Sequence, residues 1–129
     1  MEGIEARLAA IEDRLAIADL IAAFGPAADA GDGAALAALF TPDAVYEGPD
    51  FRFAGRDALA ALVGFPTHRD WMTRGVAHVL SPHNIAVTGD AATARGHSVV
   101  FLRDGEGWTV ARASANAWAF RRTTEGWRI

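Results

Sequence analysis

The chain has only four histidines, the side chains best suited to proton transfer near neutral pH. Asp29 stands among small apolar residues, and His78 and His97 fall in segments that alternate like strands. Histidine titrates near pH 6.5, and a carboxylate bonded to one ring nitrogen fixes its tautomer and strengthens it as a base. We therefore predict that Asp29, His78 and His97 form a general acid–base group. The alternative for Asp29 is a role in capping or ending a helix.

A second polar group lies in residues 111–120, where every odd position is alanine. In a strand the two sets of positions fall on opposite faces. One face would be smooth, and the other would be polar and aromatic, as in a pocket lining. The alternative is an exposed polar face in which the tryptophan covers a helix. Folding the turn at 103–107 would place His97 roughly across from Ser114. The even positions are Arg112, Ser114, Asn116, Trp118 and Phe120.

Other kinds of site lack their usual signals. No His-x-His or H-E-x-x-H pair suggests zinc, so we expect no metal. A triad of Ser114, His97 and Asp29 is disfavoured because the serine lacks a G-x-S-x-G elbow and sits within a strand. No phosphate-binding loop or dinucleotide fingerprint occurs, so we expect no cofactor.

Length and composition indicate one globular domain over residues 1–129. The chain is 51% hydrophobic and 22% charged, with a net charge of −4 and arginines scattered along its length. This pattern disfavours a nucleic-acid partner. There are no cysteines, and the N-terminus resembles neither a signal peptide nor a membrane span. We expect a cytoplasmic protein that binds neither nucleic acid nor membrane.

Hydrophobic periodicity predicts helices followed by strands. An amphipathic helix over 3–24 carries Ile4, Leu8, Ile11 and Leu15 at 4-3-4 spacing, and Gly25-Pro26 should break or kink it. Asp32 is a plausible N-cap for the next helix. The elements expected before residue 76 are a helix at 33–40, a hairpin at 44–53, a helix from 55 to about 63 and an irregular aromatic segment at 64–75. Strands are expected at 76–87, 91–102, 108–122 and 127–129, with Ser81-Pro82 as a candidate interruption of the first.

Four segments carry a resemblance to a known family: residues 27–32, 38–45, 53–58 and 121–129. They resemble the SnoaL-like branch of the nuclear transport factor 2-like superfamily. This resemblance implies an α+β fold, a cone-shaped half-barrel in which a curved, mixed but mostly antiparallel sheet packs on three N-terminal helices and encloses a pocket. Within the superfamily, the site is similar to that of scytalone dehydratase, with Asp29, His78, His97 and Ser114-Ala115-Asn116 in matching places. The tyrosines of that pattern differ, since Ala28 stands where one is expected.

These observations predict a small-molecule lyase or isomerase, dehydratase- or cyclase-like, that abstracts a proton beside a carbonyl. His78 and His97 would be acid and base, and Asp29 would orient one of them. A cyclic or aromatic substrate would contact the pocket residues Tyr46, Trp71, Met72, Ser114, Asn116 and Trp118.

Two other functions stay open. One is a non-catalytic module that binds a hydrophobic ligand or uses the fold for assembly. The other is an enzyme similar to ketosteroid isomerase, with one carboxylate base and incidental histidines. The alanine face of residues 111–119 should pack against another surface, so we also expect a homodimer or homotrimer.

Overall fold

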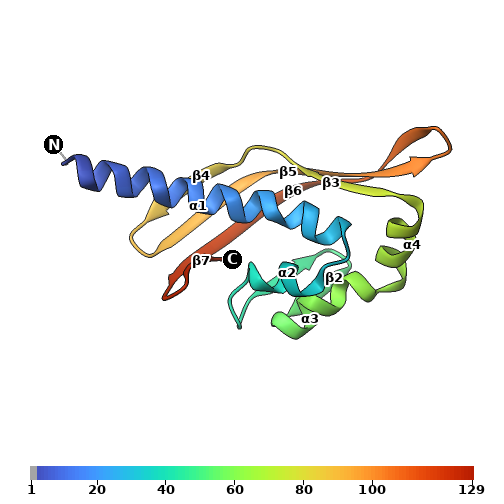
Figure 1. Cartoon of the computed structure of the whole chain (residues 1–129), viewed down its shortest axis with the longest axis horizontal. Helices are drawn as coiled ribbons and strands as arrows, with labels where there is room; N and C mark the ends of the chain where they lie inside the picture. Colours follow the sequence, from blue (N-terminus) through green and yellow to red (C-terminus); the bar gives the residue numbers. More distant parts are fainter. Residues whose placement is uncertain (1–2) are drawn as a thin grey trace.

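The structure is a computed structural model that describes residues 3–129. Helices and a small hairpin precede the strands of the main sheet (Figure 1). None of the helices in the described part is long and apolar enough to cross a membrane. The elements are α1 (Ile4–Asp29), α2 (Gly33–Ala38), β1 (Val45–Gly48), β2 (Phe51–Ala54), α3 (Arg56–Ala61), the 3₁₀ helix η1 (Leu62–Gly64), α4 (Pro66–Arg74), β3 (Val76–Leu80), β4 (Asn84–Thr88), β5 (Ala91–Asp104), β6 (Gly107–Thr123) and β7 (Gly126–Arg128).

The main sheet is built around the long strands β5 and β6. Its order is β3-β5-β6-β7, and β4 pairs with the other end of β5, so β3 and β4 follow one another along the same edge. Ser81-Pro82 separates these two strands, as the sequence predicted, because proline has no N–H to donate to a ladder. Every pairing between described strands is antiparallel, so the sheet is antiparallel rather than mixed.

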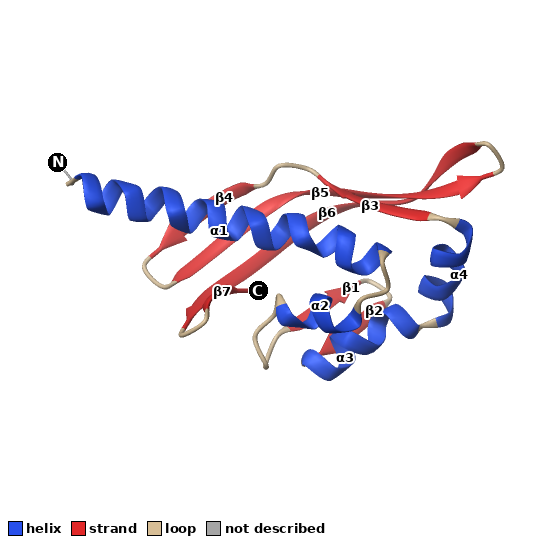
Figure 2. Ribbon diagram, in the orientation of Figure 1, coloured by secondary structure: helices blue, strands red, loops and turns tan. Residues whose placement is uncertain are grey.

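Helices and the curled sheet together form the predicted α+β half-barrel (Figure 2). Helix α1 lies across the sheet, where Ile17 and Ile21 join a core cluster that includes Phe120 and Trp127. A second cluster gathers Phe24 with residues of α2 and α3. The two clusters hold the C-terminal half of α1 between the sheet and the smaller helices.

The first helix begins where it was predicted and extends past its predicted end. It passes through Gly25 and Pro26 and ends at Asp29, where the turn that follows contains Gly31 at a φ of +67°. The missing N–H of one proline is tolerated here because Phe24, Gly25 and Ala28 are buried. The 4-3-4 stripe does not face the core: its four residues, Ile4, Leu8, Ile11 and Leu15, are all more than half exposed.

Two other local predictions have opposite outcomes. Asp32 is confirmed as the N-cap of α2, since its carboxylate accepts a hydrogen bond of 3.0 Å from the Ala35 N–H. The irregular segment expected at 64–75 is wrong, because most of it is helix α4. Pro66 occupies the first turn of that helix, the position where its lack of an N–H does no harm.

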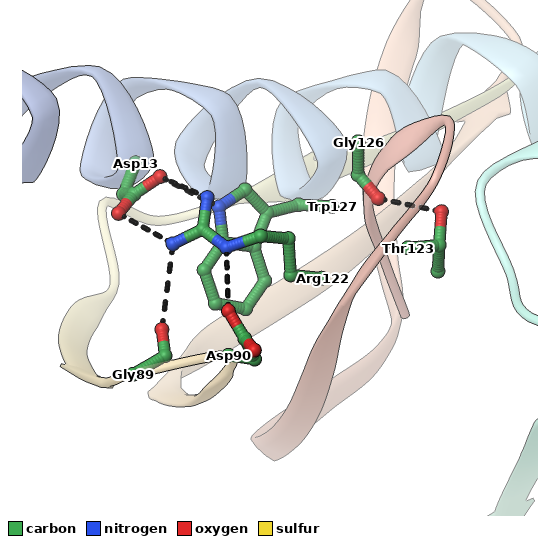
Figure 3. A network of polar contacts seen from close by, with 7 residues as sticks. All are labelled: Asp13, Gly89, Asp90, Arg122, Thr123, Gly126 and Trp127. Carbon is green, nitrogen blue, oxygen red and sulfur yellow. Dashed lines mark hydrogen bonds and ion pairs between the residues drawn. The ribbon is translucent and has the colours of Figure 1, made fainter.

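A polar network fastens α1 to the end of the sheet (Figure 3). The carboxylate of Asp13 accepts hydrogen bonds of 2.8 and 2.9 Å from the Arg122 guanidinium and one of 2.9 Å from the Trp127 indole N–H. The guanidinium also binds Asp90 and lies 4.5 Å from the centroid of the Trp127 ring. These donors lower the pKa of Asp13 to about 2.

We expect this network to make the stability of the protein fall in acid. The pKa of Asp13 is lower in the folded chain than the ordinary 3.8, so its contribution is complete above about pH 4 and is lost as the pH falls towards 2. Urea unfolding at pH 7 and pH 3 measures this loss. In Asp13→Asn the difference between the two pH values should shrink; an unchanged difference would contradict the prediction.

Candidate active site

Asp29 and His78 form a hydrogen-bonded pair between the end of α1 and the middle of β3. The ring Nδ1 of His78 lies 2.6 Å from Oδ1 of Asp29. The backbone N–H of His78 also donates to both carboxylate oxygens, at 3.1 and 3.0 Å. The His78 side chain is 8% exposed and that of Asp29 is 26% exposed. The carboxylate therefore fixes both the strand and the ring, and it does not cap its own helix.

The pair leaves His78 ready to act as a base. A carboxylate accepts hydrogen bonds, so Nδ1 carries the hydrogen and Nε2 carries the free electron pair. Within residues 3–129, the one hydrogen bond of the His78 ring is the bond from Nδ1 to Asp29, so Nε2 has no partner. Burial lowers the pKa of His78, and the opposing effect of Asp29 is smaller. The imidazole is thus neutral at neutral pH, as a base must be.

Two adjoining cavities meet at this histidine. One, of about 500 Å³, lies between α1, β1 and the sheet, and the other, of about 460 Å³, lies towards β2, η1 and α4. Four residues line both: Phe24, Tyr46, His78 and Arg112. The candidate base therefore stands where the two cavities share a wall.

Aromatic side chains form much of that wall. The Phe24 ring lies edge-on to Tyr46 at 5.6 Å between centroids, and the Trp71 ring lies 6.1 Å from that of His78. Burial raises the pKa of the Tyr46 phenol, against a weaker opposing effect of the Arg112 guanidinium. Tyr46 therefore keeps its proton at neutral pH and can donate a hydrogen bond. The guanidinium lies 5.6 Å from the Trp71 centroid and 5.8 Å from that of Phe51.

Most of the predicted pocket residues do line a cavity. Tyr46, Asn116 and Trp118 line the first, and Trp71 lines the second. Oδ1 of Asn116 and Nε1 of Trp118 are buried without a hydrogen-bond partner in residues 3–129. The face that mixes polar and aromatic groups on β6 is therefore a cavity lining.

Three predicted site residues lie elsewhere. Met72 packs on the turn after α1. Its sulfur lies so close to Gly31 that a Cβ added to this glycine would be 2.8 Å from it. Ser114 pairs with Ser98 on β5, and Ser98 is the serine that lines the first cavity. His97 is exposed and pairs with Ala115, on the alanine face of the sheet. The prediction that His97 shares the pocket is therefore wrong.

A β-bulge explains the displacement of His97. From the turn up to the pair Phe101–Val110, the hairpin has the register that would place His97 opposite Ser114. The register then shifts by one residue between Val100 and Phe101. A shift of one residue moves a side chain to the other face, because side chains alternate along a strand.

His68 also belongs to the site, although it was not among the predicted site residues. It lies on α4, is 6% exposed and lines the second cavity. Its Nε2–H donates a hydrogen bond of 2.7 Å to the carbonyl oxygen of Ala28, the residue before Asp29. Its ring centroid is 5.9 Å from that of His78, and its charge would lower the pKa of His78. The signal that could have found it is the first turn of α4, since Pro66 often begins a helix.

His83 lies apart from the candidate site. His83 Nδ1 lies 2.6 Å from the carbonyl oxygen of Ser81, and its ring covers Gly96. It does not line either cavity. Within residues 3–129, no three His, Asp or Glu side chains lie close enough together to hold a metal ion.

A curled antiparallel sheet with helices over one face and a cavity between them defines the nuclear transport factor 2-like class of α+β half-barrels. A model of the SnoaL-like domain matches residues 9–129, and the chain belongs to this family. A search of curated proteins finds no match.

Several solved structures share the fold. A nuclear transport factor 2-like protein with a cystatin-like fold from Novosphingobium aromaticivorans is 47% identical, with a TM-score of 0.95 over 99% of this chain and 86% of that one. A Mycobacterium tuberculosis protein of unknown function, solved as an Asp-to-Asn variant, is 25% identical, with a TM-score of 0.81 over 99% and 72%. A candidate scytalone dehydratase from N. aromaticivorans is 19% identical, with a TM-score of 0.71 over 98% and 83%, and this likeness concerns the fold alone.

Proposed function

We propose that the chain is a lyase or isomerase that needs no cofactor and abstracts a proton next to the carbonyl of a cyclic or aromatic substrate. The observation that carries the proposal is the Asp29–His78 pair, whose histidine lines both cavities. The superfamily includes isomerases, dehydratases and cyclases, so the chemistry is compatible with the fold. His97, on the outer face, has no part in it.

The reaction follows from the position of each group. Nε2 of His78 takes a proton from the carbon beside the carbonyl, and the electron pair of that C–H bond moves into an enolate. Asp29 stabilises the imidazolium that forms. The Tyr46 hydroxyl and the Asn116 amide are the donors available to the enolate oxygen. The imidazolium then returns the proton to another carbon, which is isomerisation, or gives it to a leaving hydroxyl, which is dehydration.

A single-carboxylate mechanism is less well supported. In a ketosteroid-isomerase-like site the Asp29 carboxylate would itself remove the proton. Here both of its oxygens accept hydrogen bonds from His78, at 2.6 to 3.1 Å. A carboxylate whose two oxygens are both engaged with His78 is not free to turn towards a substrate.

A binding module without catalysis is the second candidate. The second cavity favours it, because that lining is largely aromatic and aliphatic and could hold an apolar ligand with no reaction. The polar side chains of Tyr46 and Asn116, which line the first cavity, would then only orient the ligand.

Solvent deuterium exchange separates the two candidates without knowledge of the natural substrate. A panel of cyclic and aryl ketones is incubated with the protein in D₂O, and deuterium beside the carbonyl is measured by mass spectrometry. We expect exchange with at least one ketone, loss of it in His78→Gln, and normal exchange in the matched variant His97→Gln. Ketones that raise the melting temperature without exchanging would favour the binding module. Full exchange by His78→Gln would contradict the proposed base.

A further inference from the structure

The N-terminal half of α1 exposes an apolar stripe. Ile4 is 80% exposed, Leu8 and Ile11 are 55% exposed, and Leu15 is 59% exposed. Figure 1 shows these first turns extending past the end of the sheet. Large aliphatic side chains gathered on one strip of surface usually mark an interaction site.

The stripe faces away from the body of the protein. At 100° per residue it lies roughly 140° around the helix from the core positions Ile17, Ile21 and Phe24. On the core side, Asp13 binds Trp127, and Arg14 donates a hydrogen bond of 2.8 Å to the carbonyl oxygen of Ile85. The helix is therefore fixed in place by one side and presents the stripe on the other.

The stripe has the spacing of a coiled-coil seam, since its 4-3-4 pattern alternates d and a positions of a heptad. Charges of one sign follow each edge. The acidic edge occupies the e positions and holds Glu5, Glu12 and Asp19, and the basic edge occupies the g positions and holds Arg7 and Arg14.

This charge arrangement selects the occupant of the stripe. When two copies of such a helix run parallel, the g edge of one lies beside the e edge of the other, so basic meets acidic. When they run antiparallel, like edges meet: Arg7 faces the partner's Arg14, and Glu5 faces the partner's Glu12. The stripe is thus complementary to a parallel copy of itself.

We propose that two copies of the chain associate through a parallel pairing of their α1 helices. Arg7 of one copy lies beside Glu12 of the partner subunit, while Arg14 keeps its hydrogen bond to Ile85 of its own copy. The two globular bodies lie on opposite sides of the helix pair, because each is attached to the face opposite the stripe. The C-terminal half of each helix is already packed on the sheet, so the pairing segment continues an existing helix and needs no nucleation of its own.

Charge reversal tests both the partner and its orientation. The dissociation constant of the dimer is measured by sedimentation equilibrium at low salt. Arg7→Glu and Glu12→Arg should each weaken association roughly tenfold, and the double variant should restore it, because the pair is rebuilt with its signs exchanged. Tighter association of Arg7→Glu would overturn the parallel arrangement, since it would place the new carboxylate beside the partner's Arg14.

A second set of variants tests the surface itself. The double variant Leu8→Gln/Ile11→Gln should be a monomer with the circular dichroism spectrum of the parent chain, because both side chains are outside the core. Ala113→Glu adds a charge to the exposed outer face of β6 and should leave the dimer intact. The proposal fails if the parent chain is a monomer at the highest concentration tested. It also fails if Ala113→Glu abolishes association while the helix variant still associates.

Discussion

Replacing Asp29 by asparagine should lower turnover roughly a hundredfold or more and leave the fold intact. The amide oxygen can still accept the backbone N–H of His78, which keeps α1 joined to β3. It carries no charge, however, so the imidazolium that forms during proton abstraction loses its stabilisation. An amide turned with its NH₂ group towards the ring would also force the wrong tautomer. The measurement is kcat on a ketone found by deuterium exchange.

The pH dependence separates this role from a merely structural one. The reaction needs neutral His78, so kcat/KM should rise with pH through an apparent pKa below 6.5 and level off above it, because burial lowers the pKa of this histidine. Asp29 opposes that shift by favouring the protonated ring. In Asp29→Asn the apparent pKa should therefore fall further. A loss of activity with an unchanged pH profile would indicate displacement of the ring instead.

Asp32 supplies the matched control, as it lies three residues further along and is also a carboxylate. It is exposed and caps α2, and asparagine is an equally good N-cap. Asp32→Asn should therefore leave turnover, the pH profile and stability unchanged. If Asp29→Asn kept full turnover on a substrate that His78→Gln could not convert, Asp29 would hold the strand only.

The sequence predicted the parts of the fold that depend on local periodicity. The change from a period of 3.6 to a period of 2 near residue 76 separates helices from strands, and Asp32 marks the start of α2. Helix α4 was not predicted, because it has only nine residues and no apolar repeat strong enough to distinguish it from a loop. Whether the α1 stripe is buried or exposed could not be predicted either, because the same 4-3-4 spacing suits a core and an exposed interface equally well.

The site depended on tertiary details that periodicity does not encode. Asp29 and His78 were each visible as unusual residues, and the fold brings them to 2.6 Å. His97 was visible in the same way, but one bulge between Val100 and Phe101 turned it outward. His68 reaches the site because α4 packs against the end of α1. This contact joins segments that are far apart in the sequence, so the residues around His68 do not encode it. The sequence can identify such side chains as candidates for a site, but it does not show which of them come into contact through long-range packing.

Replacing Gly25 by alanine should damage both stability and activity, through one close approach. A Cβ at Gly25 would lie 2.5 Å from the backbone carbonyl oxygen of His78. The clash cannot be relieved by a side-chain rotation, because the oxygen belongs to the backbone of His78 and the Cβ is bonded directly to the backbone of residue 25. Overpacking of this kind costs about 1–3 kcal/mol, and the better helix propensity of alanine offsets up to about 1 kcal/mol of that loss. We expect a net loss of about 1–2 kcal/mol in urea unfolding.

The same substitution should lower turnover by more than the loss of folded protein explains. The helix can relieve the clash only by moving away from β3, and Asp29 and His78 lie on those two elements. Their 2.6 Å hydrogen bond would lengthen, and the base would lose its orientation. Gly64→Ala is the control, since a Cβ there would meet nothing within 4 Å. If Gly25→Ala were less stable but kept full turnover per folded molecule, the spacing of α1 and β3 would not set the geometry of the base.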